Sequence, residues 1–191
     1  MKIDKVLDLT TRGHSGQFRK DGKTPYILHP MKVCDFLYNF GFTRASLFEP
    51  LDNSDFNFYA VALMHDLLED TNVTEQEILD VSNVYIGGCV KKLTFRKNDD
   101  NPFAKFNYLK EITESGDLVF IVKCLDRIAN VYDFIKDGNM KYAKIYFHKA
   151  DVLWNAVYQK RSVLFEKLWK VILDLDNEFK KDKQRIKYNH I

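Results

Sequence analysis

The residues best suited to chemistry lie in one short stretch, YAVALMHDLLEDT, at positions 59–71. Six consecutive positions there hold one imidazole and three carboxylic acids: His65, Asp66, Glu69 and Asp70. At helical spacing these four side chains share one face, opposite an apolar face. Lysines one turn away usually relieve repulsion between acids on an exposed helix, but the stretch contains no lysine or arginine. The acids therefore indicate a counter-charge from elsewhere, and a bound metal ion would supply it.

Two other segments offer further metal ligands. His29 directly precedes Pro30 at the start of a predicted helix, which is a suitable place for a fixed side chain. In the segment IVKCLDRIANVYDF, helical spacing gathers the polar residues on one side; they are Lys123, Asp126, Arg127, Asn130 and Asp133. Asp126 lies at the centre of that polar face. Two imidazoles and two carboxylates would form a mixed nitrogen and oxygen site with open positions for water and phosphate.

Three motifs in this order resemble those of the HD-domain metal-dependent phosphohydrolases of the RelA/SpoT type. They are HSGQFRKDGKTPYILHP at 14–30, HDLLEDT at 65–71 and KCLDRIANV at 123–131. Together they are far more specific than the His-Asp pair alone. The resemblance implies an all-α fold, an HD-domain helical bundle around a single divalent metal site, typically with manganese. It also implies hydrolysis of ppGpp and pppGpp at the 3′ position, leaving GDP or GTP and releasing pyrophosphate.

The resemblance also implies a role for each matching residue. The implied metal ligands are His29, His65, Asp66 and Asp126. The implied pair that handles the attacking water is Glu69 and Asp70. The implied substrate contacts are Arg19, Lys20 and Asn130, with Lys123 either touching phosphate or neutralising the acidic cluster. His14 matches the first histidine of the family, but its helical stripe favours a buried, hydrogen-bonding role over metal ligation.

The elements that position these residues are expected to be helices throughout. Apolar side chains recur at spacings of three and four, and no stretch alternates as a strand would. Helices are predicted over 3–18, from Pro30 to Gly41, over 59–71, from the capping box at Thr74, over 90–93, over 118–135, and over 142–175 with one interruption. A turn is predicted at Asp21–Lys23, a break at Gly87–Gly88, loops over 42–57 and 98–102, and fraying from Glu178.

Length and composition favour one domain over the 191 residues. We expect a single HD-type hydrolase domain over 1–191, with a motif-bearing core at about 1–140 and C-terminal helices at about 141–191. The chain holds no apolar run long enough for a transmembrane helix, and its N-terminus is too polar for a secretory signal. Three widely spaced cysteines, Cys34, Cys89 and Cys124, are expected as buried hydrophobes in a reducing cytoplasm. The chain ends too early to hold a synthetase domain, so we expect a stand-alone small alarmone hydrolase.

Three departures from the family pattern border the expected pocket, so they bear on the identity of the substrate more than on the chemistry. Lys23 and Thr24 precede Pro25 where the long family enzymes are commonly one residue shorter. The region 41–57 is an extended connection between the second predicted helix and the helix over 59–71, and the chain from Tyr142 onward matches no family motif. One alternative is therefore a phosphohydrolase for another nucleotide, such as a nucleoside monophosphate or an NADPH-like phosphate.

Two non-hydrolytic alternatives are less favoured. A metal-containing regulatory module would have no use for Glu69 and Asp70 as water activators. The basic run at 180–187 is short, is interrupted by Asp182 and lacks a stacking platform, so it does not favour nucleic-acid binding. The expected partner is a small-molecule nucleotide, and the sequence does not define an oligomeric state.

Overall fold

The computed structural model describes residues 3–95, 101–160 and 162–188, with 182–188 as backbone only. The predicted all-α class is confirmed: this part of the chain has no strand, only an isolated bridge between Phe18 and Pro25. The helices are α1 (Ile3–Gly13), α2 (Leu28–Asn39), α3 (Asn53–Met64), α4 (Leu67–Asp70), α5 (Glu75–Val81), α6 (Val84–Leu93), α7 (Ala104–Glu114), α8 (Asp117–Lys136), α9 (Met140–His148), α10 (Asp151–Lys160) and α11 (Val163–Tyr188).

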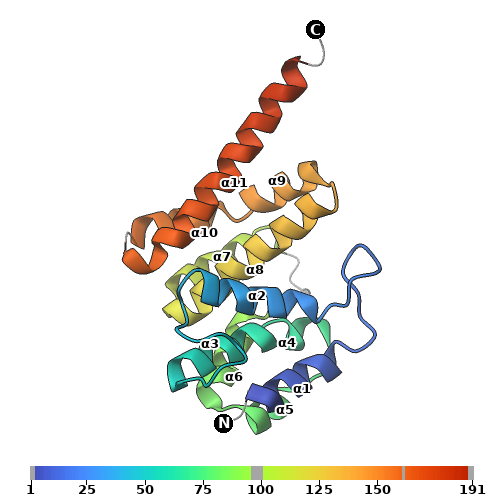
Figure 1. Cartoon of the computed structure of the whole chain (residues 1–191), viewed down its shortest axis with the longest axis vertical. Helices are drawn as coiled ribbons and strands as arrows, with labels where there is room; N and C mark the ends of the chain where they lie inside the picture. Colours follow the sequence, from blue (N-terminus) through green and yellow to red (C-terminus); the bar gives the residue numbers. More distant parts are fainter. Residues whose placement is uncertain (1–2, 96–100, 161, 189–191) are drawn as a thin grey trace.

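Helix α8 lies at the centre of the molecule. It packs against α2, α3, α6, α7 and α9, while α1 packs on α3 and α5. Figure 1 shows α1 and α5 at the end of the molecule that holds the N-terminus, and α11 extending away from the body at the other end. Because α8 has neighbours on several sides, even its charged residues Lys123, Asp126 and Arg127 are buried. Charged groups in such a position need partners.

The prediction of one helix over 59–71 is wrong in one important respect. Helix α3 ends at Met64, His65 is its C-terminal cap, and α4 begins only after Asp66. Residues 59–64 are fully buried, so this part of α3 is not the apolar side of an amphipathic helix and is enclosed on all sides. Neighbouring side chains on a continuous helix diverge by about 100°. Although His65 (φ −58°, ψ −29°) and Asp66 (φ −101°, ψ −6°) keep right-handed helical backbone angles, their side chains meet, with His65 Nε2 3.1 Å from Asp66 Oδ2.

Other boundaries differ for local reasons. The predicted helix over 3–18 ends at Gly13, and Gly16 follows in the left-handed region with φ 75°. Helix α3 begins inside the predicted loop over 42–57, because Asp52 caps it by accepting a 2.8 Å hydrogen bond from the Asp55 N–H. The predicted break at Gly87–Gly88 lies within α6. There a Cβ on Gly87 would meet the Leu79 side chain at 2.9 Å, so glycine permits close packing of α5 on α6.

The later helices are also divided differently. Helix α7 falls where no helix was predicted, and 142–175 holds parts of α9, α10 and α11, so it is interrupted twice rather than once. Helix α11 continues through Glu178 to Tyr188. The predicted loop over 98–102 falls partly outside the described residues.

Several local predictions are confirmed. Thr74 and Glu77 form the predicted capping box, and Gly41 follows α2 with φ 79°. The predicted turn at 21–23 is held by the Asp21 carboxylate, which accepts bonds from the backbone N–H groups of Lys23 and Thr24. The three cysteines are free and buried. None of the helices in the described ranges is long and apolar enough to cross a bilayer.

Candidate active site

The four side chains predicted as metal ligands converge on one point. His29 comes from α2, His65 and Asp66 from the break between α3 and α4, and Asp126 from α8. His29 Nε2 lies 3.1 Å from Asp126 Oδ1, and His65 Nε2 lies 3.1 Å from Asp66 Oδ2. The two crossed distances, from His29 to Asp66 and from His65 to Asp126, are 3.7 and 3.8 Å. Atoms that bind one ion at about 2.1 Å lie about 3 to 4 Å from each other. This spacing fits a shared ion most closely for His29, His65 and Asp66, whose ligand atoms all lie within 4.8 Å of one another, and Asp126 approaches this group through the two imidazoles.

The hydrogen bonding of His65 provides an independent test of that fit. Its Nδ1 lies 2.7 Å from the Ala62 carbonyl oxygen. Because a carbonyl can only accept, Nδ1 carries a hydrogen, which leaves the Nε2 lone pair to bind either a proton or a metal ion. That Nε2 atom is buried and makes no hydrogen bond of acceptable geometry, even though Asp66 Oδ2 lies 3.1 Å away. A lone pair that faces two carboxylates favours a cation between them, and the donor set therefore suits a divalent metal ion.

The charges around this point are strongly coupled. Burial opposes ionisation of Asp126, but Lys123, with its Nζ 2.8 Å from Oδ2, outweighs burial and holds the pKa of Asp126 well below its ordinary value. Burial would likewise lower the pKa of His65, but the carboxylates of Asp66 and Asp126 raise it to about 10. The site therefore favours positive charge at its centre. The ion pair also fits a neutralising role for Lys123.

The two acids predicted to handle water lie on α4, beside the ligand cluster. Glu69 Oε2 accepts a 2.9 Å hydrogen bond from the Phe95 backbone N–H. Asp70 Oδ2 accepts a 3.0 Å hydrogen bond from the Tyr26 hydroxyl, and the Asp70 carbonyl accepts one of 2.7 Å from Gln17 Nε2. Both carboxylates are half-buried and fixed in orientation, and both line the same cavity as Asp66 and Asp126.

Sequence reasoning did not single out Tyr26, although it lies within the first motif. Its hydroxyl oxygen lies 2.7 Å from Asp66 Oδ2 and 3.0 Å from Asp70 Oδ2, so its single hydrogen is shared between the two carboxylates. Burial and then Asp66 raise the pKa of Tyr26 far above its ordinary value, so the hydroxyl stays protonated and remains a donor. The ring of Tyr26 stacks on His14 with centroids 4.5 Å apart. His14 is buried and hydrogen-bonded to Gln17, as predicted, rather than placed among the ligands.

A cavity of about 270 Å³ opens beside the ligand cluster. Its lining includes every predicted catalytic and substrate residue, namely Arg19, Lys20, Glu69, Asp70, Lys123 and Asn130. Lys105 of α7, Arg127 of α8 and Tyr146 of α9 also line it. Burial, followed by repulsion from Lys123 and Arg127, lowers the pKa of Lys105 to about 8. This concentration of positive charge suits an anionic ligand.

Two of the predicted substrate residues, Arg19 and Asn130, form a hydrogen-bonded chain that ends at the ligand cluster. Arg19 Nη2 donates to Asn130 Oδ1 at 2.6 Å, and Asn130 Nδ2 donates to Asp126 Oδ1 at 2.6 Å. Lys20 lies over the aromatic rings of Phe134 and Tyr142, with Nζ 4.6 and 4.9 Å from their centroids. Its ammonium thus has a fixed position at the rim of the cavity.

Comparison with known proteins gives consistent results, although no family model matches the sequence. A guanosine-3′,5′-bis(diphosphate) 3′-pyrophosphohydrolase of Borreliella burgdorferi is 39% identical over 77 residues, which cover 40% of this chain and 10% of that protein. The human guanosine-3′,5′-bis(diphosphate) 3′-pyrophosphohydrolase MESH1 is 30% identical over 134 residues, which cover 67% of this chain and 66% of that protein. This chain therefore matches a small part of the long bacterial relative and about two thirds of the short human one.

The fold has a solved counterpart. The structure of a metazoan ortholog of SpoT that hydrolyses ppGpp superimposes with a TM-score of 0.71. The superposition covers 90% of this chain and 93% of the other, at 19% sequence identity. At that identity the match establishes the helical fold, and the site residues depend on the geometry described above.

Proposed function

This chain belongs to the HD-type (p)ppGpp hydrolase family, and we propose that it hydrolyses ppGpp and pppGpp to GDP or GTP and pyrophosphate. The observation that carries the proposal is the convergence of His29, His65, Asp66 and Asp126 beside two fixed carboxylates. We further propose that residues 1–191 form a single HD-type hydrolase domain that acts in the cytoplasm on a small nucleotide. Its motif-bearing core lies at about 1–140, and the later helices extend it.

HD-type hydrolases use a divalent metal, and we propose that these four side chains hold one ion, preferably Mn²⁺. When bound, the ion supplies Lewis acidity towards a phosphoryl oxygen and makes a water molecule more acidic. His65 is prepared for this role by its Nδ1–H bond to Ala62, which directs the Nε2 lone pair to the centre. Lys123 offsets one carboxylate charge, so that the cluster is not left with excess negative charge.

In the proposed reaction, Glu69 and Asp70 orient the attacking water and accept its proton. Each carboxylate is fixed by a donor from another segment, Glu69 by the Phe95 N–H and Asp70 by the Tyr26 hydroxyl. A fixed carboxylate loses little freedom when the water binds. The water must approach in line with the leaving 3′ oxygen, and a nucleotide without a 3′ phosphate should therefore bind poorly and not react.

The distribution of positive charge supports a substrate with phosphates at more than one position. Arg19 and Lys20 come from the segment before α2, whereas Lys105, Lys123 and Arg127 come from α7 and α8. We propose that Arg19, Lys20, Asn130 and Lys123 contact the nucleotide, with Lys105 and Arg127 as additional phosphate contacts. Arginine suits the planar contacts to phosphate and base, and lysine adds a point charge.

Replacement of Tyr26 by phenylalanine should slow hydrolysis even at saturating Mn²⁺, a condition that compensates for weaker metal binding caused by the lost contact with Asp66. A hydrogen bond to a charged group contributes about 1.5–3 kcal/mol, which corresponds to roughly 10- to 100-fold in rate if the bond orients Asp70 in the transition state. Steady-state kinetics and elemental analysis of the variant measure both quantities. Tyr38→Phe, on the exposed part of α2, is the control. Unchanged kinetics at saturating Mn²⁺ would show that the hydroxyl does not act on Asp70.

A panel of nucleotides tests the proposed substrate. Manganese-loaded protein should hydrolyse ppGpp and pppGpp and leave nucleoside monophosphates, deoxynucleoside triphosphates and NADPH intact. If the protein hydrolysed a monophosphate or NADPH and left ppGpp intact, the proposed substrate would be wrong. The proposed phosphohydrolase chemistry would still hold. If fully metal-loaded protein hydrolysed none of them, the protein would be a regulatory module instead.

A further inference from the structure

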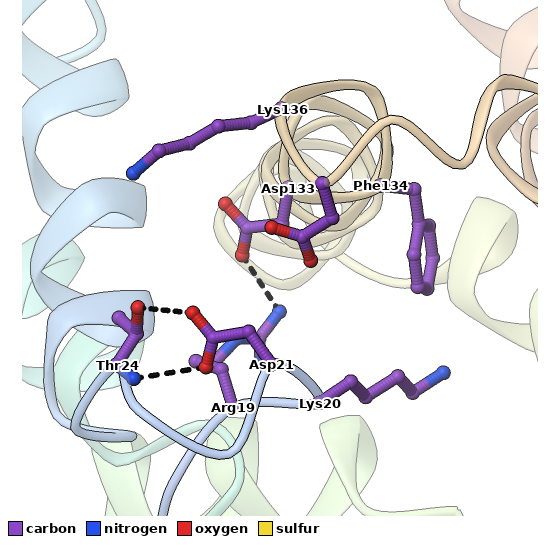
Figure 2. A pocket seen from close by; sticks show the side chains of 8 residues that line it. Arg19, Lys20, Asp21, Thr24, Asp133, Phe134 and Lys136 are labelled. Carbon is purple, nitrogen blue, oxygen red and sulfur yellow. Dashed lines mark hydrogen bonds and ion pairs between the residues drawn. The ribbon is translucent and has the colours of Figure 1, made fainter.

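Asp133 joins three segments of the molecule at the edge of the cavity. Its Oδ2 accepts a 2.8 Å hydrogen bond from Arg19 Nη2, and its Oδ1 accepts a 2.7 Å bond from Lys32 Nζ. Arg19 belongs to the segment between α1 and α2, Lys32 to α2, and Asp133 to α8. Figure 2 shows the Arg19 side chain reaching toward Asp133, above the turn held by Asp21 and Thr24. The Asp133 carboxylate therefore links the loop at 14–27, which carries most of the first motif, to the central helix α8.

The contacts of Arg19 explain why this link to Asp133 matters for substrate binding. The loop itself is held by local bonds, including one from the Arg19 N–H to the Thr24 carbonyl at 2.7 Å. The guanidinium, by contrast, is fixed from α8 by Asp133 and Asn130. A free arginine side chain has many rotamers, and their loss on binding weakens affinity. A guanidinium already held in place avoids most of that loss.

Lys32, the second cation that contacts Asp133, affects the net charge of the group. A lone carboxylate would cancel the charge of Arg19 and repel a phosphate nearby. Lys32 shares the carboxylate, so the group of three side chains keeps one net positive charge. The group can therefore fix the guanidinium and still attract an anion.

We propose that Asp133 is a positioning residue, which holds the Arg19 guanidinium in the orientation that receives the nucleotide. The proposal rests on the proposed nucleotide hydrolysis and adds to it a residue that acts only through Arg19. Asp133 itself does not touch the substrate. Its loss should therefore affect binding and leave the chemical step at Glu69 and Asp70 intact.

The test is a double-mutant cycle on ppGpp hydrolysis. Asp133→Asn keeps the shape of the side chain and removes its charge, and it should raise KM about tenfold, as expected for loss of one charge-assisted bond. The kcat should stay within about twofold of wild type. In an Arg19→Ala background the same substitution should raise KM no further, because its effect passes through Arg19.

Asp137→Asn is the matched control. Asp137 lines the same small pocket as Asp133 and follows α8 directly, so this variant removes the same charge from the same region. It should leave KM unchanged, and circular dichroism and thermal unfolding check that all variants fold. Equal effects of the two substitutions, additivity with Arg19→Ala, or a fall in kcat would each overturn the positioning role.

The outcomes also separate this inference from the proposed substrate. If the wild-type protein cleaves a different nucleotide of the panel, the substrate is wrong, and the same cycle on that nucleotide still tests Asp133. If the protein cleaves none of them, the proposed function and the inference are both overturned.

Discussion

Replacement of Asp66 by alanine should abolish both metal binding and hydrolysis. Asp66 Oδ2 lies 3.1 Å from His65 Nε2 and 3.7 Å from His29 Nε2, so its loss removes one ligand and leaves the two imidazoles without this carboxylate. Loss of an outer-shell partner alone typically costs roughly 10- to 100-fold in metal affinity, and loss of a direct ligand should cost more. Elemental analysis of the purified variant measures the metal, and turnover of ppGpp measures the activity.

Thermal unfolding gives a second measurement for the same variant. Added Mn²⁺ should raise the unfolding temperature of the wild-type protein, because a ligand that binds only the folded state stabilises it. It should leave Asp66→Ala unaffected. Asp8→Ala, on the exposed side of α1, is the control and should bind metal as the wild type does. Equal metal content in wild type and Asp66→Ala would remove Asp66 from the site.

Asp70→Asn and Glu69→Gln should separate metal binding from turnover. Each substitution keeps the size of the side chain and its ability to accept the bond seen from Tyr26 or Phe95. An amide cannot accept the proton of the attacking water, and loss of such a group typically costs on the order of 10²–10⁴-fold in rate. Elemental analysis should show wild-type metal content in both variants, and single-turnover kinetics should show the slower chemical step.

Glu114→Gln, exposed near the end of α7, is the control for a simple change of charge. Near-wild-type rates in both Glu69→Gln and Asp70→Asn would exclude these acids from the mechanism. Loss of metal in either variant would assign that residue to the ion instead.

The candidate site residues could be predicted because each lies in a short sequence motif whose residue types suggest its chemistry. The repulsion among the acids at 65–70 and the polar face of 123–133 are visible in the sequence, and the structure brings both to one point. The direction of the side chains was not visible. Periodicity placed His65 and Asp66 on one polar face of a continuous helix, whereas both residues are buried and lie between two helices. Because α3 is buried before its C-terminus, its sequence has no change in polar periodicity that would predict where the helix ends.

Residues that act through distant contacts could not be found in this way. Lys105 lies on α7, where no helix was predicted, so nothing placed it near the cavity. The bond from Tyr26 to Asp70 joins residues 44 positions apart, and that from Arg19 to Asp133 joins residues 114 apart. Pairings over such separations follow from how the segment before α2 packs against α4 and α8, which periodicity within a helix does not define.

The products formed from ppGpp provide the most direct test of the proposed function. Manganese-loaded protein is incubated with ppGpp, and the products are separated chromatographically and identified by phosphorus NMR. Cleavage at the 3′ position by the site at His29, His65, Asp66 and Asp126 should yield GDP and pyrophosphate in equal amounts, and Asp70→Asn should yield almost none in the same time. Release of orthophosphate in place of pyrophosphate, or intact ppGpp after incubation with fully metal-loaded protein, would contradict it.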